Sequence, residues 1–513
     1  MNNPVYSLSN FIGDFPFTID GVISFACKYY PNKEAVVAQN SSLTYSNLNN
    51  AINNFAFTLQ KNGIKRYDRI ALVLSNTPEF VIGLFGIIRT GAIPLLIFPQ
   101  IKVPEFEETV IKSQTKAVVT DINGYKRFSL ILEKKHLPLF LFNNQELDIP
   151  AVCFDYRISE IHIPIIQSPS IDIDPAIIVF TSGTSKSPKG VVLNHKNLLT
   201  NCISNIKAIG MNEEDSTLII LPLTHLYSLS HQLFCTLFTG GTLHLIDAMF
   251  LPHLFYKYLD NVNITWFAGT PSVFYSIIKY NESQSNKPKA ADSLRMLTIG
   301  GGAISPPAVK KLERLFPNTN LIITYGLTEN SPRVSTYYYS ENKDKLGTVG
   351  KALPNVEVLQ NIKPEEDGAF NLIVRGSTVM YGYIDSSGEI VRRNSDELNT
   401  GDIGFVDSDG YVQIVGRNKK IINSAGYKIQ PAEVERIINS FPGILDSTVY
   451  GSPHDIYGEA VHCSVILEEG KNITKRDLIS FCRKYLTDYK IPKYFKLTFT
   501  PKLNSNHKFV HEI

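Results

Sequence analysis

The stretch that decides the fold runs from Ile177 to Gly190 and reads Ile-Ile-Val-Phe-Thr-Ser-Gly-Thr-Ser-Lys-Ser-Pro-Lys-Gly. It opens with four apolar residues, three of them β-branched, which predicts a buried strand. The chain then enters a loop in which Gly183 lets the backbone turn tightly and Lys186 and Lys189 bring positive charge. Hydroxyl groups that can donate hydrogen bonds come from Thr181, Ser182, Thr184 and Ser185. A strand that ends in such a loop favours a site for phosphate oxygens; the alternative is a polar surface turn, and no Gly-Lys-Thr or Gly-Lys-Ser pair makes it a Walker loop.

Composition excludes several classes of protein. The chain has 513 residues, 43% of them hydrophobic and 19% charged, so we expect packed cores in roughly three or four domain-sized units. The net charge of +2 gives no basic excess for binding nucleic acid and no sign of disorder. Six cysteines without metal-type spacing favour free buried thiols in a reducing compartment. Because no signal peptide and no membrane-spanning apolar run is visible, the sequence predicts a soluble cytoplasmic protein.

Strand and helix patterns alternate before the phosphate loop. Leu43–Leu59 has apolar residues at helical spacing, and Thr44 is a good helix-start residue. Arg69–Leu74 is typical of a strand, Pro78–Ile88 of an apolar helix and Gly91–Phe98 of a second buried strand. Strand, helix and strand at this spacing predict an α/β fold in which helices connect parallel strands.

The pattern continues less clearly after these elements. Ala117–Ser170 shows short apolar runs alternating with loops, Asn194–Gly210 is typical of a helix, and Thr242–Ile246 of a strand. From Ile421 onward the composition shifts to a small α+β pattern. Pro431, followed by acidic residues in a first turn, predicts the start of a helix there.

Three later stretches carry candidate binding residues. In Leu294–Ala303 a strand ends in three glycines, whose backbone can lie flat against a planar ligand; the alternative is a tight loop. Ile322–Glu329 ends in Tyr-Gly-Leu-Thr-Glu, and Glu329 offers the hard carboxylate that Mg²⁺ prefers. Asp402 follows a glycine turn, where its carboxylate can accept hydrogen bonds from both hydroxyls of a ribose.

These motifs resemble those of the adenylate-forming superfamily, which includes acyl-CoA synthetases, the adenylation domains of peptide synthetases, and luciferases. The loop is similar to the family's Thr-Ser-Gly-Thr-Thr-Gly-x-Pro-Lys-Gly, with Lys186 in place of the second Gly. Tyr325–Glu329 matches Tyr-Gly-x-Thr-Glu completely. Asn504-Ser-Asn-His-Lys508 resembles Asn-x-Asn-Gly-Lys, with His507 in place of Gly. The resemblance extends from about Leu43 to Lys508.

The resemblance implies a fold of the acyl-CoA synthetase type. A large N-terminal adenylation domain of several subdomains with parallel-type sheets would span residues 1–416. A small, mobile α+β C-terminal domain would span residues 417–513. The hinge between them would lie near Arg417, with Lys420 as its pivot.

The resemblance also implies a set of site residues. ATP or AMP would be bound by Thr181, Ser182, Gly183, Thr184, Lys189, Gly301, Gly302, Ala303, Tyr325, Gly326, Asp402 and Arg417. The catalytic residues would be Lys508, Thr328, Glu329 and His225, with Glu329 also binding Mg²⁺. The acyl pocket would include His225, Tyr227, Gly301 and Ser331, and the pantetheine of CoA would meet Ser424, Gly426, Tyr427 and Lys428. For His225 the alternative is a histidine satisfied in the core.

The function implied is that of an AMP-forming acid–thiol ligase. A carboxylic acid, fatty or aryl, would attack the α-phosphorus of ATP to give an acyl-adenylate and pyrophosphate, and the acyl group would pass to the thiol of CoA. No Asp lies between Leu221 and Tyr227, near where amino-acid-adenylating relatives keep one, which disfavours an amino acid. Two alternatives stay open: transfer to a carrier-protein phosphopantetheine, and a degenerate nucleotide-binding protein without turnover, suggested by Lys186 and His507.

Overall fold

The computed structural model describes residues 16–39, 41–142, 151–157, 165–181, 189–248, 250–284, 292–304, 306–361, 370–417, 421–467, 470–498, 502–503 and 509–510. The strand that leads into the phosphate loop, β8, lies inside a nine-stranded mixed sheet. In spatial order the sheet consists of β20 (Ile390–Arg392), β19 (Gly382–Ile384), β9 (Lys189–Asn194), β8 (Pro175–Thr181), β4 (Ile93–Leu96), β3 (Arg69–Val73), β5 (Ala117–Asp121), β6 (Leu139–Phe142) and β7 (Val152–Phe154). The strands from β8 to β7 run parallel to one another, and β9, β19 and β20 are added antiparallel.

A second nine-stranded mixed sheet carries the glycine-rich and Tyr-Gly-Leu-Thr-Glu stretches. Its strands are, in order, β16 (Lys351–Ala352), β15 (Arg333–Tyr338), β14 (Asn320–Gly326), β13 (Met296–Ile299), β12 (Trp266–Gly269), β10 (Ser216–Ile219), β11 (Thr242–Leu245), β1 (Glu34–Ala38) and β2 (Ser41–Thr44). The six strands from β14 to β1 are parallel. Two largely parallel sheets joined by helices confirm the α/β class expected from the sequence.

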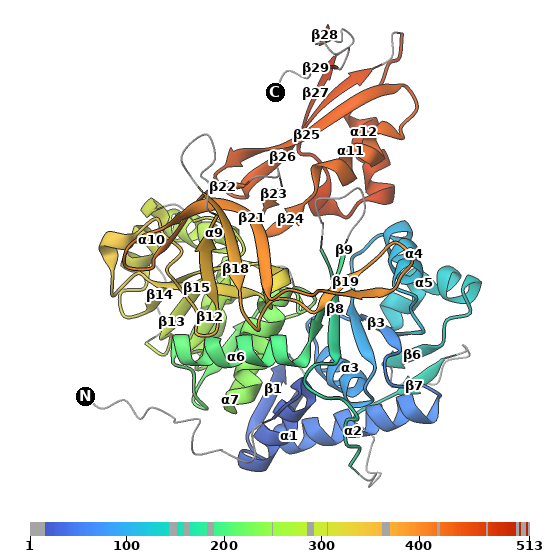
Figure 1. The fold of residues 1–513 in the computed structure, drawn as a ribbon, viewed down its shortest axis with the longest axis vertical. Helices are drawn as coiled ribbons and strands as arrows, with labels where there is room; N and C mark the ends of the chain where they lie inside the picture. Colours follow the sequence, from blue (N-terminus) through green and yellow to red (C-terminus); the bar gives the residue numbers. More distant parts are fainter. Residues whose placement is uncertain are drawn as a thin grey trace.

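The helices cover the faces of these sheets, and α6 contacts strands of both, β9 and β15 (Figure 1). They are α1 (Ile19–Tyr29), α2 (Tyr45–Lys61), α3 (Pro78–Arg89), α4 (Val103–Lys112), α5 (Ile122–Lys134), α6 (His195–Ile209), α7 (Cys235–Thr239), α8 (Pro252–Asn261), α9 (Pro271–Ser283) and α10 (Pro306–Leu315). A π-helix, η2 (Tyr227–Phe234), precedes α7, and single 3₁₀ turns form η3 (Thr328–Asn330), η4 (Lys343–Lys345) and η5 (Asp488–Lys490).

Local signals explain where several helices begin and end. The side chain of Thr44 accepts a hydrogen bond from the amide of Asn47 and so caps α2, as predicted. Asn194 caps α6 in the same way, and Gly210 ends it in the left-handed conformation. Neither the helix α5 within Ala117–Ser170 nor the strand β9, which directly follows the phosphate loop, was predicted from the sequence.

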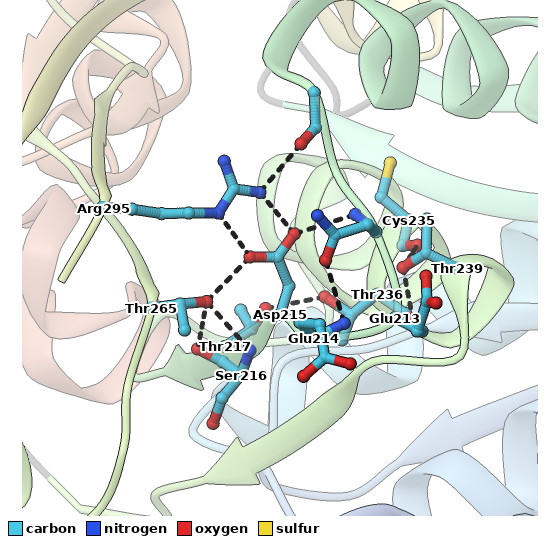
Figure 2. A network of polar contacts seen from close by, with 12 residues as sticks. Glu213, Glu214, Asp215, Ser216, Thr217, Cys235, Thr236, Thr239, Thr265 and Arg295 are labelled. Atoms are coloured by element: carbon cyan, nitrogen blue, oxygen red, sulfur yellow. Dashed lines mark hydrogen bonds and ion pairs between the residues drawn. The ribbon is translucent and has the colours of Figure 1, made fainter. Parts of the chain in front are cut away.

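A network around Asp215 fixes the amino ends of three parallel strands (Figure 2). Asp215, which directly precedes β10, is 2% exposed and accepts hydrogen bonds from Arg295 Nε at 2.7 Å and from Thr265 Oγ1 at 2.8 Å. Thr265 directly precedes β12, and Arg295 directly precedes β13. The network is therefore structural, and it lies at the end of the sheet opposite to the carboxyl ends where ligands bind in such folds.

A third sheet and a separate C-terminal unit follow (Figure 1). The third sheet contains β17 (Glu357–Gln360), β18 (Phe370–Arg375), β21 (Glu397–Val406) and β22 (Val412–Arg417). The C-terminal unit contains β23 (Ile422–Ser424), β24 (Tyr427–Ile429), β25 (Ile444–His454), β26 (Gly458–Leu467), β27 (Tyr494–Thr498), α11 (Pro431–Asn439), α12 (Lys475–Tyr485) and the pair β28 (Lys502–Leu503) and β29 (Phe509–Val510). It has its own buried apolar core, which agrees with the small domain expected from the sequence.

The predicted hinge and boundary stay predictions. Lys420, the predicted pivot, lies outside the described residues, and Arg417 is the last residue of β22. The described residues include no helix that is long and apolar enough to cross a membrane. The six cysteines form no disulfide. Four of them are buried as expected, but Cys153 is exposed at the edge strand β7 and Cys27 is half-buried, so burial of all six thiols was wrong.

Candidate active site

A pocket of about 1010 Å³ lies at the carboxyl ends of the parallel strands of both large sheets, and the C-terminal unit contributes part of its wall. This is the place where open α/β sheets bind ligands. Residues at or just beyond the ends of β8, β10, β11, β12, β13 and β14 line it, namely Thr181, Ile220, Ile246, Thr270, Gly301 and Tyr325. From the C-terminal unit come Ala425, Gly426, Tyr427, Lys428, Ile456, Tyr457 and Tyr489.

Tyr325 lines the pocket and contacts Asp402, a second predicted adenosine residue. The hydroxyl of Tyr325 donates a hydrogen bond to Asp402 Oδ2 at 2.5 Å. Asp402 is 1% exposed, and its Cα pairs with that of Arg417 across β21 and β22. Gly301, in the left-handed conformation with a φ of +77°, lines the pocket beside them. Tyr325 and Gly301 therefore line the pocket, whereas the buried carboxylate of Asp402 accepts the Tyr325 hydroxyl and is not part of the lining.

The phosphate corner begins at the end of β8. Thr181 Oγ1 is buried and has no hydrogen-bond partner among the described residues. A buried hydroxyl of this kind needs an acceptor or donor, and a phosphate oxygen of a bound nucleotide would supply one. Ser182, Gly183, Thr184 and Lys186, which the sequence also predicts here, lie outside the described residues.

Lys189 and Glu329 both interact with Tyr383. Lys189 Nζ lies 5.2 Å from the centre of the Tyr383 ring, because β9 pairs directly with β19. Burial raises the pKa of Tyr383, and the carboxylate of Glu329 raises it further. The described residues hold no cluster of three His, Cys, Asp or Glu side chains that could bind a metal ion, so magnesium binding by Glu329 stays a prediction.

His225 belongs to an aromatic contact between the two parts of the molecule. Its ring centre lies 5.2 Å from that of Tyr427 and 6.4 Å from that of Phe98. Tyr427 in turn stacks on Tyr489 at 4.0 Å. Burial lowers the pKa of His225 to about 4, so the imidazole is neutral near pH 7. His225 therefore faces the pocket rather than the core.

The loop that joins β23 to β24 packs against the glycine-rich segment. Gly426 has a φ of +86°, and a Cβ placed on it would lie 2.3 Å from Thr270 Cγ2. The space around Gly301 is bounded by the backbone of Gly426, 3.9 Å from an added Cβ. Only a glycine fits this loop so close to the floor of the pocket.

The end of the pocket near Tyr227 contains residues that the sequence analysis missed. The Tyr227 hydroxyl donates to the carbonyl of Thr298 at 3.3 Å, and its ring stacks on His231 one turn further along η2. Arg333 lines the pocket here, and its Nη2 faces the His231 ring, 2.8 Å from Nδ1. No local pattern in the sequence marks His231 or Arg333 as residues of the site.

Some predicted residues do not line the pocket. The Ser331 side chain is buried and donates to the carbonyl of Thr378 at 2.7 Å, which turns it away from the acyl pocket predicted for it. The lining includes Thr328 and Gly326. It does not include the predicted residues Lys189, Gly302, Ala303, Glu329, Asp402 and Ser424. Lys508 lies outside the described residues.

Comparison with known proteins supports a single family. The model of the AMP-binding enzymes matches residues 24–384, and that of their C-terminal domain matches residues 433–508. An oxalate–CoA ligase of Arabidopsis thaliana is 30% identical over 94% of this chain and 95% of its own length. A long-chain-fatty-acid–CoA ligase of Bacillus subtilis (strain 168) is 28% identical over 93% of this chain and 90% of its own length.

The solved structures share the fold. That of o-succinylbenzoate CoA synthetase from Bacillus subtilis, bound to a product analogue, superimposes with a TM-score of 0.81 at 23% identity, covering 95% of this chain and 97% of that one. The fold of both parts of the molecule thus has counterparts among solved structures. The chain belongs to the family of AMP-binding enzymes.

Proposed function

We propose that this chain is an AMP-forming acid–thiol ligase that converts a carboxylic acid into its CoA thioester through an acyl-adenylate. The observation that carries the proposal is one pocket lined by both the Tyr325–Thr328 motif and the loop Ala425–Lys428 of the C-terminal unit. Relatives named as CoA ligases of oxalate and of long-chain fatty acids, matched over nine-tenths of the chain, support the same activity.

The first half of the reaction would use the nucleotide side of the pocket. The acid carboxylate attacks the α-phosphorus of ATP, and the bond to pyrophosphate breaks. Thr181, Thr328 and Lys189, with the predicted residues Ser182, Gly183, Thr184 and Lys508, would stabilise charge on the transferring phosphate. Mg²⁺ held by Glu329 would supply further charge stabilisation. Tyr325, Gly301, Gly326, Asp402 and Arg417 would hold the adenosine.

The second half would use the face of the C-terminal unit that lies on the pocket. A thiol attacks the acyl carbon, and AMP leaves. Tyr427, Gly426 and Lys428 line the pocket where the pantetheine arm of CoA would enter. Neutral His225, which lies beside Tyr427 and Phe98, would accept a hydrogen bond at the junction. Rotation about a hinge near Lys420 would exchange this face for that of Lys508.

The two enzyme alternatives differ in the thiol that accepts the acyl group. CoA is the acceptor named for the relatives in sequence, whereas a carrier-protein phosphopantetheine is the second candidate. The free thiols fit the reducing cytoplasm predicted from the sequence.

Two measurements on the purified chain test the proposal. Pyrophosphate release with ATP, Mg²⁺ and a panel of acids should depend on the acid, and adding CoA should convert the product to a thioester and release AMP. No release with any acid would leave only a nucleotide-binding protein. Release without transfer to CoA, but with transfer to a phosphopantetheine-loaded carrier protein, would decide for the second acceptor.

A further inference from the structure

Arg333 is a buried cation without an acidic partner. It is 2% exposed, and in the described part of the chain no carboxylate pairs with its guanidinium. Instead Nη1 donates to Thr336 Oγ1 at 3.1 Å, and Nη2 faces the His231 ring, 2.8 Å from Nδ1 and closer still to Nε2. Burial lowers the pKa of Arg333 to about 10, which still leaves it charged near neutral pH.

His231 does not balance this charge. Burial lowers the pKa of His231 well below its ordinary value, and the charge of Arg333 lowers it further. The imidazole is therefore neutral: it accepts a hydrogen bond from Arg333 and supplies no negative charge.

The other cations buried to a similar degree are paired. Among the described residues, Arg89 lies 2.9 Å from Asp20, and Lys490 lies 2.7 Å from Glu105 and 2.8 Å from Glu433. Removing a charge from water without an opposite charge nearby is strongly unfavourable. Within the described part of the chain Arg333 departs from this pattern, which suggests that its counter-charge arrives with a ligand.

Arg333 lies in the same pocket as the residues proposed to bind the adenylate. It is the first residue of β15, and its Cα pairs with that of Gly326, inside the Tyr325–Thr328 motif. Neighbouring strands lie only about 4.7–4.9 Å apart. The charge of Arg333 also acts on the ring of Tyr227, where it opposes the upward shift of the pKa that burial causes. A short acid whose reacting carboxylate lay beside this motif would therefore have its other end close to Arg333.

We propose that the acid is a short dicarboxylic acid and that Arg333 binds the carboxylate that does not react. This inference rests on the proposed ligase function and names its substrate class. The planar guanidinium can bind a carboxylate through two parallel hydrogen bonds, and the pair would supply the missing counter-charge. A monocarboxylic acid would place an apolar tail against Arg333 and leave the charge unpaired. The fatty or aryl acid that the resemblance implied is thus the poorer fit.

The first experiment uses the wild-type chain and needs no variant. Acid-dependent pyrophosphate release and CoA thioester formation are measured for pairs of equal carbon number: oxalic and acetic, malonic and propionic, succinic and butyric acid. Octanoic and 4-coumaric acid complete the panel. We expect one dicarboxylic acid to exceed its monocarboxylic partner in kcat/KM by about 100-fold or more, the size of effect seen when one partner of a buried charge pair is removed. Equal or better use of the monocarboxylic partners, or of octanoic or 4-coumaric acid, overturns the inference.

The second experiment assigns the preference to Arg333. Arg333→Met should raise the KM for the best dicarboxylic acid by about 100-fold while leaving the KM for ATP near the wild-type value. Its activity with the matched monocarboxylic acid should stay equal or rise. Arg333→Lys keeps the charge but loses the fork, so it should recover part of the lost affinity. Arg314→Met, on the exposed face of α10, is the matched control and should behave as wild type.

The outcomes separate this inference from the proposed function. If the wild-type chain releases no pyrophosphate with any acid, the ligase function itself is contradicted. A ligase that prefers monocarboxylic acids, or an Arg333→Met variant with an unchanged preference, contradicts only the role of Arg333. If Arg333→Met does not fold, as judged by its thermal unfolding, Arg333→Lys and the wild-type acid pairs decide the question.

Discussion

At the residue scale, three buried histidines share one physical situation. His195, His225 and His231 are all held neutral because burial lowers their pKa. His195 serves the fold: it is 1% exposed, and its Nδ1 accepts a hydrogen bond from the amide of Ile19 at 3.1 Å. His225 faces the pocket and His231 orients Arg333. Burial thus keeps all three imidazoles neutral, although His195 stabilises the fold whereas His225 and His231 belong to the proposed site.

His195 links stability to pH. Its pKa falls from 6.5 to about 4 on folding, so the unfolded chain binds a proton more readily. Its contribution to the free energy of unfolding is therefore full above pH 6.5 and is lost as the pH falls toward 4. His195→Gln keeps an acceptor for Ile19 but cannot titrate. Urea unfolding at several pH values between 7 and 4.5 gives the free energy of unfolding as a function of pH. In the variant this free energy should depend on pH less steeply than in the wild type, by up to about 1.4 kcal/mol per pH unit. Parallel curves for variant and wild type would show that His195 does not titrate in this way.

Asp402 permits a test of the adenosine corner. Asp402→Asn removes the charge while keeping the size, and Tyr325 loses its charged acceptor at 2.5 Å. A hydrogen bond to a charged group contributes about 1.5–3 kcal/mol, so we expect the KM for ATP to rise by roughly 10- to 100-fold. The KM for the acid should change little. Steady-state pyrophosphate release at varied ATP measures both; an unchanged KM for ATP argues against adenosine binding at Asp402.

Some residues of the site could be predicted from the sequence, and others could not. Tyr325, Thr328 and Gly301 could be nominated because each belongs to a local pattern whose chemistry is readable. Arg333 could not, because a lone arginine in a strand is usually solvated, and its burial depends on His231 and the sheet around it. Tyr489 was missed for a related reason, since only the folded chain brings its ring to 4.0 Å from Tyr427.

At the element scale, short connections carry the proposed chemistry. The loop between β23 and β24 reaches the pocket because Gly426 packs against Thr270. The π-helix η2 is a second short element of this kind. It brings the rings of Tyr227 and His231 together at the end of the pocket near Arg333. π-Helices are rare and often occur at functional sites, and no residue pattern in this stretch predicts one.

Gly426 is the position where this docking can be tested. Gly426→Ala adds a Cβ that would lie 2.3 Å from Thr270 Cγ2, so the loop must withdraw from the pocket. We expect thioester formation to fall by about 10- to 100-fold, the scale of a misplacement near 1 Å, while acid-dependent pyrophosphate release stays near wild type.

Gly470→Ala is the matched control for the backbone strain. Gly470 also has a positive φ, +79°, but no atom lies within 4 Å of an added Cβ. If both alanine variants affect thioester formation equally, the contact with Thr270 has no part in the reaction.

Element prediction succeeded where the signal was local. α2, α3, β3 and β4 were identified from their periodicity and, for α2, from the cap at Thr44. The pairing of β9 with β19 joins residues nearly two hundred positions apart, and nothing near Lys189 encodes it. α5 was missed because only Phe128, Ile131 and Leu132 of that helix are buried.

At the scale of the whole molecule, the C-terminal unit is held against α4 by a buried ion pair. Glu105 on α4 accepts hydrogen bonds from Lys490 Nζ and from Thr487 Oγ1, both at 2.7 Å. Lys490 also pairs with Glu433 of its own unit. The contact stabilises the arrangement in which Tyr427 and Lys428 line the pocket, which is the one that thioester formation would need.

Loosening this contact should affect the two half-reactions differently. Glu105→Ala should lower the rate of thioester formation from a supplied acyl-adenylate by about 10-fold or more, because a buried ion pair loses one partner. Adenylate formation should be spared. Glu107→Ala is the control, since Glu107 lies on the same helix and pairs with Lys134 within the large part at 2.9 Å. Equal behaviour of the two variants would mean that the ion pair does not control docking.

The central claim is that one pocket performs two half-reactions with two faces of the C-terminal unit. The most direct measurement separates them in Lys508→Ala: pyrophosphate release from ATP and acid, and thioester formation from a supplied acyl-adenylate and CoA. Our account predicts a loss of about 100-fold or more in the first and a rate near wild type in the second, because Lys508 would stabilise charge only while the α-phosphate is attacked. Equal losses in both half-reactions would contradict the exchange of faces.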